Sequence, residues 1–466
     1  MTPPLPPPST TDLVVVLPGI TGSTLRSPDG LVWSPSAGSL LRAIKSLGRT
    51  LTRLRLPEGI GDEHPDDGVQ PVALMPDLHL VPGVWTPLKG YDLLLERLRS
   101  LGYRESPDQP DAPPGNLLPV PYDWRLSNRY NGRRLATLVE PALERLRAQG
   151  GPYADARLVF VCHSMGGLVA RWYIEHCGGA EITRKLITFG TPYRGAAKAL
   201  DQLVNGVRRG IGPLSVDLTA FARSMPSLHQ LLPEYAFIEN SGALAKTTEV
   251  TVPELDQGQT TDAMRFHTQL NDAEAARPSA LTATHAIVGI HQNTATTARI
   301  TTDGVTLLDT YNADHLFGDG TVPLVAASRP GVPMDSNTLR RVPDHHGNLH
   351  RNPAALDELE GVLAARDIVV RAPATEHLRL DVPELITAEE DLTVRVTAVS
   401  GERTAVRLTV SDEAGRLEQA RVVIAGADPV EAVLDGLPPG AHTVDAVGTA
   451  PGSRIAPVSA TTLKWQ

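Results

Sequence analysis

Cysteine is scarce in this chain of 466 residues, which has only Cys162 and Cys177. Cys162 ends an apolar strand pattern and Cys177 lies near the end of the helix pattern that follows, so the two are too far apart for a disulfide. This excludes a disulfide framework, the usual support of small secreted domains. We expect both cysteines to be small buried side chains and the protein to be cytoplasmic.

Long apolar runs are also missing. No segment approaches 18 uninterrupted apolar residues, which excludes a transmembrane helix. The first eight residues, Met-Thr-Pro-Pro-Leu-Pro-Pro-Pro, have neither the basic nor the apolar region of a secretory signal. We therefore expect residues 1–11 to be a disordered, proline-rich leader.

Positive charge is in deficit, since the formal net charge is −10. With no basic stripe to neutralise phosphates, nucleic acid is excluded as a partner. The short basic run from Arg42 to Arg55 contains leucines at intervals and predicts an amphipathic helix of a cap, or else a contact with an anionic lipid surface. A hydrophobic content of 41% is enough for a large core and a second domain.

One segment carries the most information. Residues 158–171 read as an apolar strand, the sequence His-Ser-Met-Gly-Gly, and a run compatible with a helix. This layout is typical of a nucleophile elbow, where a strained turn pushes the hydroxyl of Ser164 outward. Gly166 provides the small residue that the turn needs on one side, whereas Cys162 stands where the usual G-x-S-x-G pattern has glycine. The alternative is a buried strand before a glycine-rich helix start in any α/β protein.

Further candidates follow the order Ser, Asp, His expected for this type of enzyme. Asp319 lies between two glycines, and a histidine cluster spans residues 345–350. Near the N-terminus, a β-branched strand runs into the sequence Pro-Gly-Ile-Thr-Gly-Ser at 18–23. A loop in this place supplies one main-chain N–H of an oxyanion hole, so we assign the two donors to Ile20 and Met165.

Together these motifs resemble the lecithin:cholesterol acyltransferase-like family of α/β-hydrolase lipases and acyltransferases. The resemblance covers roughly residues 12–365. It is carried by Pro-Gly-Ile-Thr-Gly-Ser (18–23), Pro-Tyr-Asp-Trp-Arg (121–125), the elbow, Phe-Gly-Thr-Pro (189–192) and Gly-Asp-Gly-Thr-Val-Pro (318–323). It implies an α/β-hydrolase fold with a mostly parallel central sheet flanked by helices.

The family's catalytic triad maps onto Ser164, Asp319 and His346. His346 is preferred as the base because the segment after it reads like the opening of the last helix in the family, with His345 as the runner-up and His350 least favoured. No cofactor and no metal are expected. For Asp123 and Arg125 we favour a buried ion pair that ties a cap or a strand end.

The expected catalytic domain spans residues 12–366. Strands are predicted at 13–17, 117–121, 157–163, 185–189, 284–290 and 305–309, the last two returning the chain to the sheet before Asp319. Helices are predicted at 90–101, 132–149, in the run after the elbow and at 353–363. A long irregular insertion near 26–80 and another near 193–280 are expected to form a cap or lid.

After about residue 366 the pattern changes to alternation. Seven short strands separated by Gly, Pro and Asp turns predict an immunoglobulin-like β-sandwich over 367–466, although it lacks the Cys, Trp, Cys signature. The family resemblance does not extend to this part. It is either a module that binds an unknown protein partner or a rigid appendage of the hydrolase.

Two functions of different class follow. The first is a serine-dependent acyl-ester hydrolase (a lipase, phospholipase or carboxylesterase) or O-acyltransferase, acting through an acyl-enzyme on lipid or small acyl-ester substrates, with peripheral contact to a lipid surface as an option. The second is a catalytically inactive α/β-hydrolase scaffold that binds a lipid or protein partner. The full set of triad residue types and oxyanion loops favours the first.

Overall fold

A computed structural model of the chain describes residues 11–33, 54–76, 90–106, 113–209, 216–278, 281–333, 336–364, 376–450 and 453–465. The proline-rich leader and nearly all of the basic run from Arg42 to Arg55 lie outside these ranges. In the described part, no helix combines the length and the apolar character needed to cross a membrane.

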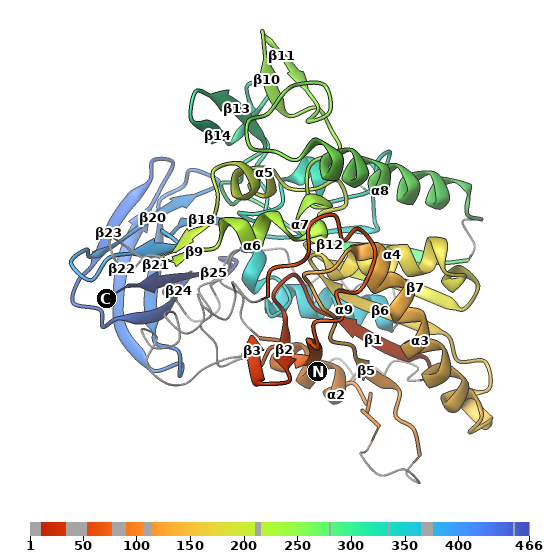
Figure 1. Cartoon of the computed structure of the whole chain (residues 1–466). Helices are drawn as coiled ribbons and strands as arrows, with labels where there is room; N and C mark the ends of the chain where they lie inside the picture. Colours follow the sequence, from red (N-terminus) through yellow and green to blue (C-terminus); the bar gives the residue numbers. More distant parts are fainter. Residues whose placement is uncertain are drawn as a thin grey trace.

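A six-stranded sheet in which every neighbouring pair is parallel forms the centre of the larger domain (Figure 1). Its strands run in the order β5 (Leu117–Pro119), β1 (Leu13–Leu17), β6 (Leu158–His163), β7 (Thr183–Phe189), β12 (Ala283–Gly289) and β17 (Leu339–Val342). Strands β1 and β6 are buried along their whole length, as their unbroken apolar sequences require in a sheet covered on both faces.

Four helices cover this sheet. Helices α3 (Asn128–Arg147) and α4 (Gly166–His176) pack on each other and on the strands around β6. Helix α9 (Pro353–Leu363) packs on β7, β12 and β17, and Arg97 of α2 (Asp92–Ser100) pairs with Asp357 of α9. A mostly parallel sheet between helices, with a serine elbow after its central strand, is the α/β-hydrolase fold, so the predicted fold class is confirmed.

Two predictions about the elements are wrong. The region near 26–80 is not wholly irregular, because β2 (Ser23–Ser27), β3 (Gly30–Trp33) and β4 (Gln70–Leu74) form a small antiparallel sheet. The strand predicted at 305–309 exists as β14 (Gly304–Leu308), but it does not join the central sheet. It pairs with β13 (Thr297–Thr301) in a separate four-stranded sheet, and the sixth central strand is β17, which the sequence analysis missed.

Much of the insertion near 193–280, including β10, β11, α5 and α8, lies in the upper part of the molecule in Figure 1, together with β13 and β14. Its longest element is the 20-residue helix α8, whose first turn is capped by the side chain of Asp256. The elements are α5 (Ala197–Val204), β8 (Arg208–Arg209), β9 (Val216–Asp217), α6 (Thr219–Arg223), α7 (Pro226–His229), β10 (Ile238–Asn240), β11 (Ala243–Ala245) and α8 (Gln257–Ala276). Two very short strands, β15 (Thr310–Tyr311) and β16 (Asp314–His315), follow β14.

The C-terminal part is a sandwich of two sheets. One has the order β18-β20-β23 and the other β19-β25-β24-β21-β22, and both contribute to one hydrophobic core that is separate from the core of the larger domain. All seven predicted strands are present, and the short β19 was missed. The strands are β18 (Leu378–Asp381), β19 (Leu385–Ile386), β20 (Leu392–Ala398), β21 (Thr404–Ser411), β22 (Leu417–Ala425), β23 (Val430–Leu434), β24 (Gly440–Gly448) and β25 (Val458–Lys464).

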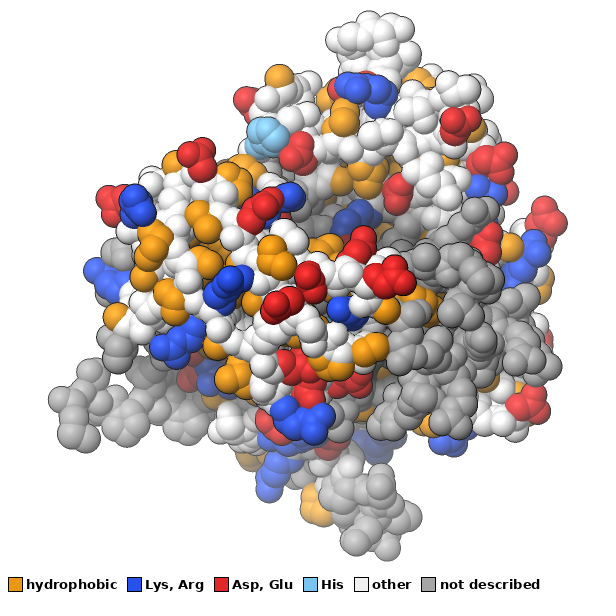
Figure 2. Space-filling model, turned by 90° about the vertical axis from the view of Figure 1, so that its left-hand side faces the viewer, with side chains coloured by type: hydrophobic (Ala, Val, Ile, Leu, Met, Phe, Trp, Pro, Cys, Tyr) orange, Lys and Arg blue, Asp and Glu red, His pale blue; other side chains and the backbone are white. Residues whose placement is uncertain are grey.

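This two-sheet arrangement is what the structure shows; its immunoglobulin-like character stays a prediction. Acidic and basic side chains are interspersed on the face that Figure 2 presents, without an extended patch of one sign. The exposed apolar side chains of the sandwich include Leu417, Val422 and Ile424 on its outer strand β22.

Candidate active site

Ser164 occupies the turn between β6 and α4. Its φ of 51° is in the left-handed region that non-glycine residues seldom adopt, as a nucleophile elbow requires. The Ser164 N–H donates to the carbonyl of Phe189 (2.8 Å), and the Thr191 hydroxyl donates to the carbonyl of Ser164 (2.8 Å). Both main-chain polar groups of Ser164 are thus hydrogen-bonded, which fixes the strained turn. Ser164 is only 6% exposed.

His346 lies between this serine and Asp319. Its Nε2 is 2.9 Å from Ser164 Oγ, and its Nδ1 is 2.8 Å from Asp319 Oδ2. Because a carboxylate only accepts, the neutral ring donates Nδ1–H to Asp319 and leaves Nε2 free to accept the serine proton. The other carboxylate oxygen, Oδ1, accepts from the N–H groups of Thr321 and Val322 at 2.9 and 2.7 Å. The structure therefore joins all three predicted triad residues in one hydrogen-bonded chain.

The other two histidines of the cluster point elsewhere. Nε2 of His345 donates to the carbonyl of Leu380 in the sandwich at 2.8 Å, and Nε2 of His350 donates to the carbonyl of Gly90 at 2.9 Å. In the described structure, His346 is the member of the cluster whose ring is hydrogen-bonded to Ser164.

The Phe-Gly-Thr-Pro motif makes this close assembly sterically possible. A Cβ atom at Gly190 would lie 2.9 Å from Asp319 Oδ2 and 3.0 Å from His346 Nδ1, and the residue has a φ of +57°. Glycine meets both demands, since it has no Cβ and adopts positive φ at little cost. The motif therefore serves the elbow through Phe189 and Thr191, and the acid–base pair through Gly190.

The oxyanion donors predicted from the sequence are the main-chain N–H groups of Ile20 and Met165. In the described part of the chain, neither Ile20 N–H nor Met165 N–H has a hydrogen-bond acceptor, and both residues are buried. Buried N–H groups without partners are rare in folded proteins. The turn at Thr21, which has a φ of 61°, brings the first loop close to the elbow, and a Cβ at Gly19 would lie 2.9 Å from Ser164 Cβ. This is the arrangement expected of donors kept for an oxyanion.

A buried chain of hydrogen bonds also connects the first loop, the residue before Ser164 and the segment that carries His346. Gly19 N–H donates to the Tyr91 hydroxyl (2.8 Å), which lies 2.9 Å from His163 Nδ1, and His163 Nε2 lies 3.1 Å from the carbonyl of His346. Since a carbonyl can only accept, His163 must carry its proton on Nε2 and accept the Tyr91 proton on Nδ1. Burial is the main reason that the pKa of His163 lies well below its usual value, in keeping with this neutral ring.

The Pro-Tyr-Asp-Trp-Arg motif supports the first loop. The Tyr122 hydroxyl donates to the carbonyl of Pro18 at 2.9 Å. Arg125 is fully buried and pairs with Asp123 (2.7 Å) and with Asp67 (2.8 Å). The ion pair expected between Asp123 and Arg125 is thus present, and it also fastens the 54–76 segment to the domain.

Two residues of the site were missed from the sequence, and a third residue was misjudged. Tyr91 and the role of His163 were missed, because their contacts join positions 72 residues apart and leave no local pattern. Cys162 is buried as expected, but Cys177 is partly exposed.

In the described residues, no group of three or more His, Cys, Asp or Glu side chains is arranged to hold a metal ion.

Fold and site together define an α/β-hydrolase with a serine elbow. The sequence model of the lecithin:cholesterol acyltransferase family matches residues 86–315, a range that contains the Pro-Tyr-Asp-Trp-Arg motif, the elbow and the Phe-Gly-Thr-Pro motif, and over this range the resemblance is confirmed.

Other similarities are more distant. An uncharacterized protein of Saccharomyces cerevisiae is 29% identical over 182 residues, which cover 38% of this chain and 23% of the yeast protein. The chain thus matches about a quarter of that relative's length. The mature form of the Bacillus licheniformis lipase BlEst2 aligns with 77% of this chain and 94% of its own at 12% identity and a TM-score of 0.36. Its propeptide form aligns with 98% and 94% at 10% identity and a TM-score of 0.37.

Proposed function

We propose that the chain is a serine-dependent acyl-ester hydrolase or O-acyltransferase, with lipid-like esters as substrates. The observation that carries this proposal is the chain from Ser164 Oγ through His346 to Asp319, with distances of 2.9 and 2.8 Å. A serine hydroxyl becomes a useful nucleophile when an adjacent imidazole accepts its proton.

In this mechanism, His346 takes the proton of Ser164 as its oxygen attacks the ester carbonyl. Asp319 holds the ring in the required tautomer and stabilises the imidazolium that forms. The N–H groups of Ile20 and Met165 then bind the oxyanion, an effect worth about 3 kcal/mol for one donor. The protonated His346 donates to the leaving alcohol, and a covalent acyl-enzyme remains on Ser164.

The second half of the reaction needs an acceptor for the acyl group. Water gives hydrolysis, and an alcohol gives acyl transfer; His346 removes the proton of either one. We favour a lipase, phospholipase or carboxylesterase, because the two cysteines of the chain are free, whereas the secreted acyltransferases of the family it resembles have disulfides. Product analysis with and without an added alcohol distinguishes the two outcomes.

Labelling with a fluorophosphonate probe tests the nucleophile. We expect an adduct on Ser164 in the unaltered protein, with and without mild detergent, located by mass spectrometry. Ser164→Ala removes the site, and His346→Ala lowers the labelling rate by about a thousandfold or more, because the serine loses its base.

The matched controls are Ser241→Ala and His64→Ala, which change an exposed serine and a surface histidine away from the elbow. Both should label at the rate of the unaltered protein. Absence of an adduct on Ser164 in both conditions would overturn the enzyme proposal and favour the catalytically inactive scaffold.

A further inference from the structure

The loop that carries Asp319 is fastened to the sandwich by one buried side chain. The main chain of Gln292 exchanges two hydrogen bonds with Gly318, at 3.0 and 3.1 Å, next to the acid. Its side chain reaches β18 of the sandwich, where Nε2 donates to the carbonyl of Leu378 and Oε1 accepts from Leu380 N–H, both at 3.1 Å. Gln292 is fully buried, so water does not compete for these bonds.

The loop that carries His346 is fastened in a similar way. Asp344, two residues before the base, is fully buried, and its Oδ1 accepts from Ser459 N–H at the start of β25 (3.0 Å) and from His345 N–H (2.8 Å). Its Oδ2 accepts from Asn352, the side chain that caps α9. His345 itself donates to the carbonyl of Leu380.

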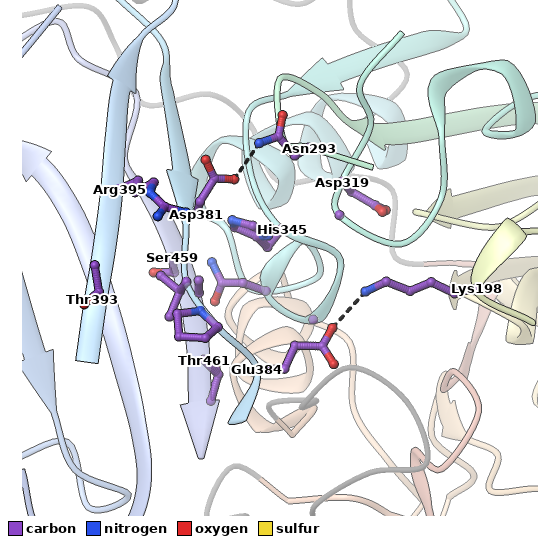
Figure 3. A pocket seen from close by; sticks show the side chains of 16 residues that line it. Lys198, Asn293, Asp319, His345, Asp381, Glu384, Thr393, Arg395, Ser459 and Thr461 are labelled. Carbon is purple, nitrogen blue, oxygen red and sulfur yellow. Dashed lines mark hydrogen bonds and ion pairs between the residues drawn. The ribbon is translucent and has the colours of Figure 1, made fainter. Parts of the chain in front are cut away.

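These polar contacts are not a by-product of a shared hydrophobic core, since the two cores are separate clusters. A cavity of about 460 Å³ lies between the loops and the sandwich (Figure 3). At its edge, Asn293 bonds Asp381 and Lys198 pairs with Glu384, both at 2.8 Å. The sandwich therefore touches the acid and base loops through a few directed bonds around a hollow.

Loops without regular structure need such external partners to hold a side chain within a few tenths of an ångström. A displacement of about 1 Å in a catalytic group can lower the rate a hundredfold. Strands β18 and β25 belong to rigid sheets with their own core, so their main-chain groups are fixed reference points for both loops.

We propose that the C-terminal sandwich positions the acid and base of the active site, and that Gln292 and Asp344 are the positioning residues that transmit this. The inference rests on the function proposed for Ser164, Asp319 and His346. It gives the sandwich a role in turnover, apart from any partner that its outer surface binds.

Gln292→Met in the full chain tests this inference, because methionine keeps the length of the side chain but forms neither bond to β18. We expect kcat for a p-nitrophenyl ester and the rate of fluorophosphonate labelling to fall about tenfold or more, with KM changed less than kcat. Hydrogen exchange of segments 316–323 and 344–349 should become faster. Asp344→Asn should give the same pattern, because its amide NH₂ group would face N–H groups that now donate to the carboxylate.

Lys198→Met is the matched control, since it removes an ion pair across the same interface that does not involve either loop. Its kcat and the hydrogen exchange of its loops should stay within about twofold of the unaltered protein, because partly exposed ion pairs contribute little to stability. Thermal unfolding of each variant shows whether it is folded at the assay temperature.

If folded Gln292→Met and Asp344→Asn both match Lys198→Met in kcat and in loop exchange, the sandwich is a passive appendage and the inference is wrong. If the unaltered protein does not label at Ser164, the proposed function fails on its own account. The exchange measurement then still decides whether the sandwich orders the two loops.

Discussion

Tyr91 illustrates how one hydroxyl can organise several catalytic segments. It accepts from Gly19 N–H beside the proposed oxyanion donor Ile20, and it donates to His163, which precedes the nucleophile. The last bond of the chain ends on the main chain of His346. The relative positions of the oxyanion loop, the elbow and the base thus depend on residues that do not contact the reacting atoms.

We therefore expect Tyr91→Phe to lower kcat about tenfold, because the buried Gly19 N–H loses its acceptor and the first loop can shift. The lost bond should also lower the free energy of unfolding by about 1–3 kcal/mol. Steady-state kinetics and urea unfolding measure the two effects. Tyr173→Phe, which removes a hydroxyl of α4 that donates to Glu140 of α3, should lose stability without losing kcat. Equal kcat values in the two variants would contradict the positioning role.

The elbow shows what an element needs beyond its secondary-structure pattern. A Cβ at Gly166, the first residue of α4, would lie 2.4 Å from the carbonyl oxygen of Pro18 and 2.9 Å from that of Leu17. Both atoms are main chain and cannot rotate away. Helix α4 therefore packs against the end of β1 at a distance that only glycine allows.

Gly166→Ala should accordingly destabilise the protein by about 1–3 kcal/mol, the usual effect of overpacking, and slow the labelling of Ser164. Gly258→Ala is the matched substitution in the first turn of α8, where the nearest atom to a new Cβ is Asp256 Oδ1 at 3.2 Å. There alanine should be neutral or stabilising by up to about 1 kcal/mol, through its higher helix propensity. Urea unfolding of both variants tests this prediction, and a shift of the same sign in both would refute it.

Element prediction from sequence succeeded where one segment contains its own signal. Strands 13–17 and 158–163 and the helix at 353–363 are confirmed. Unbroken apolar runs mark the two strands, and a proline marks the first turn of the helix. It assigned β14 to the wrong sheet and missed β17, because the sequence of a short strand with mixed residues does not indicate which sheet the strand joins. Pairing depends on partners far along the chain, and here the chain makes a separate antiparallel sheet before it returns to the central one.

At the scale of the whole molecule, buried and half-buried histidines with a lowered pKa make stability depend on pH. Burial is the main cause that lowers the pKa of His267 in α8, of His285 in the central strand β12 and of His291 just after β12 to about 4. In the unfolded chain, the pKa of histidine is near 6.5, so between these values the unfolded state binds more protons. The free energy of unfolding should therefore be highest above about pH 6.5 and fall as the pH drops toward 4.

His267 is almost completely buried and should contribute on the order of 3 kcal/mol to this loss. We expect His267→Gln to flatten the pH dependence of unfolding between pH 6.5 and 4, measured by urea titration. His315→Gln changes an exposed histidine and should leave the slope as it is. If the free energy of unfolding falls equally steeply with pH in these two variants, burial of His267 does not cause the loss of stability in acid.

The sequence by itself determined the fold class, the elbow, the candidates Ser164 and Asp319, and the alternating strands of the sandwich. Each of these is written in a short stretch, as periodicity or as a motif around a glycine turn. The tertiary structure decided which of three neighbouring histidines meets the serine, and it brought Tyr91 behind the elbow. It also placed Gln292 and Asp344 between the catalytic loops and the sandwich. Those relations join residues from distant parts of the chain, and they arise only when the sheets and loops are packed together.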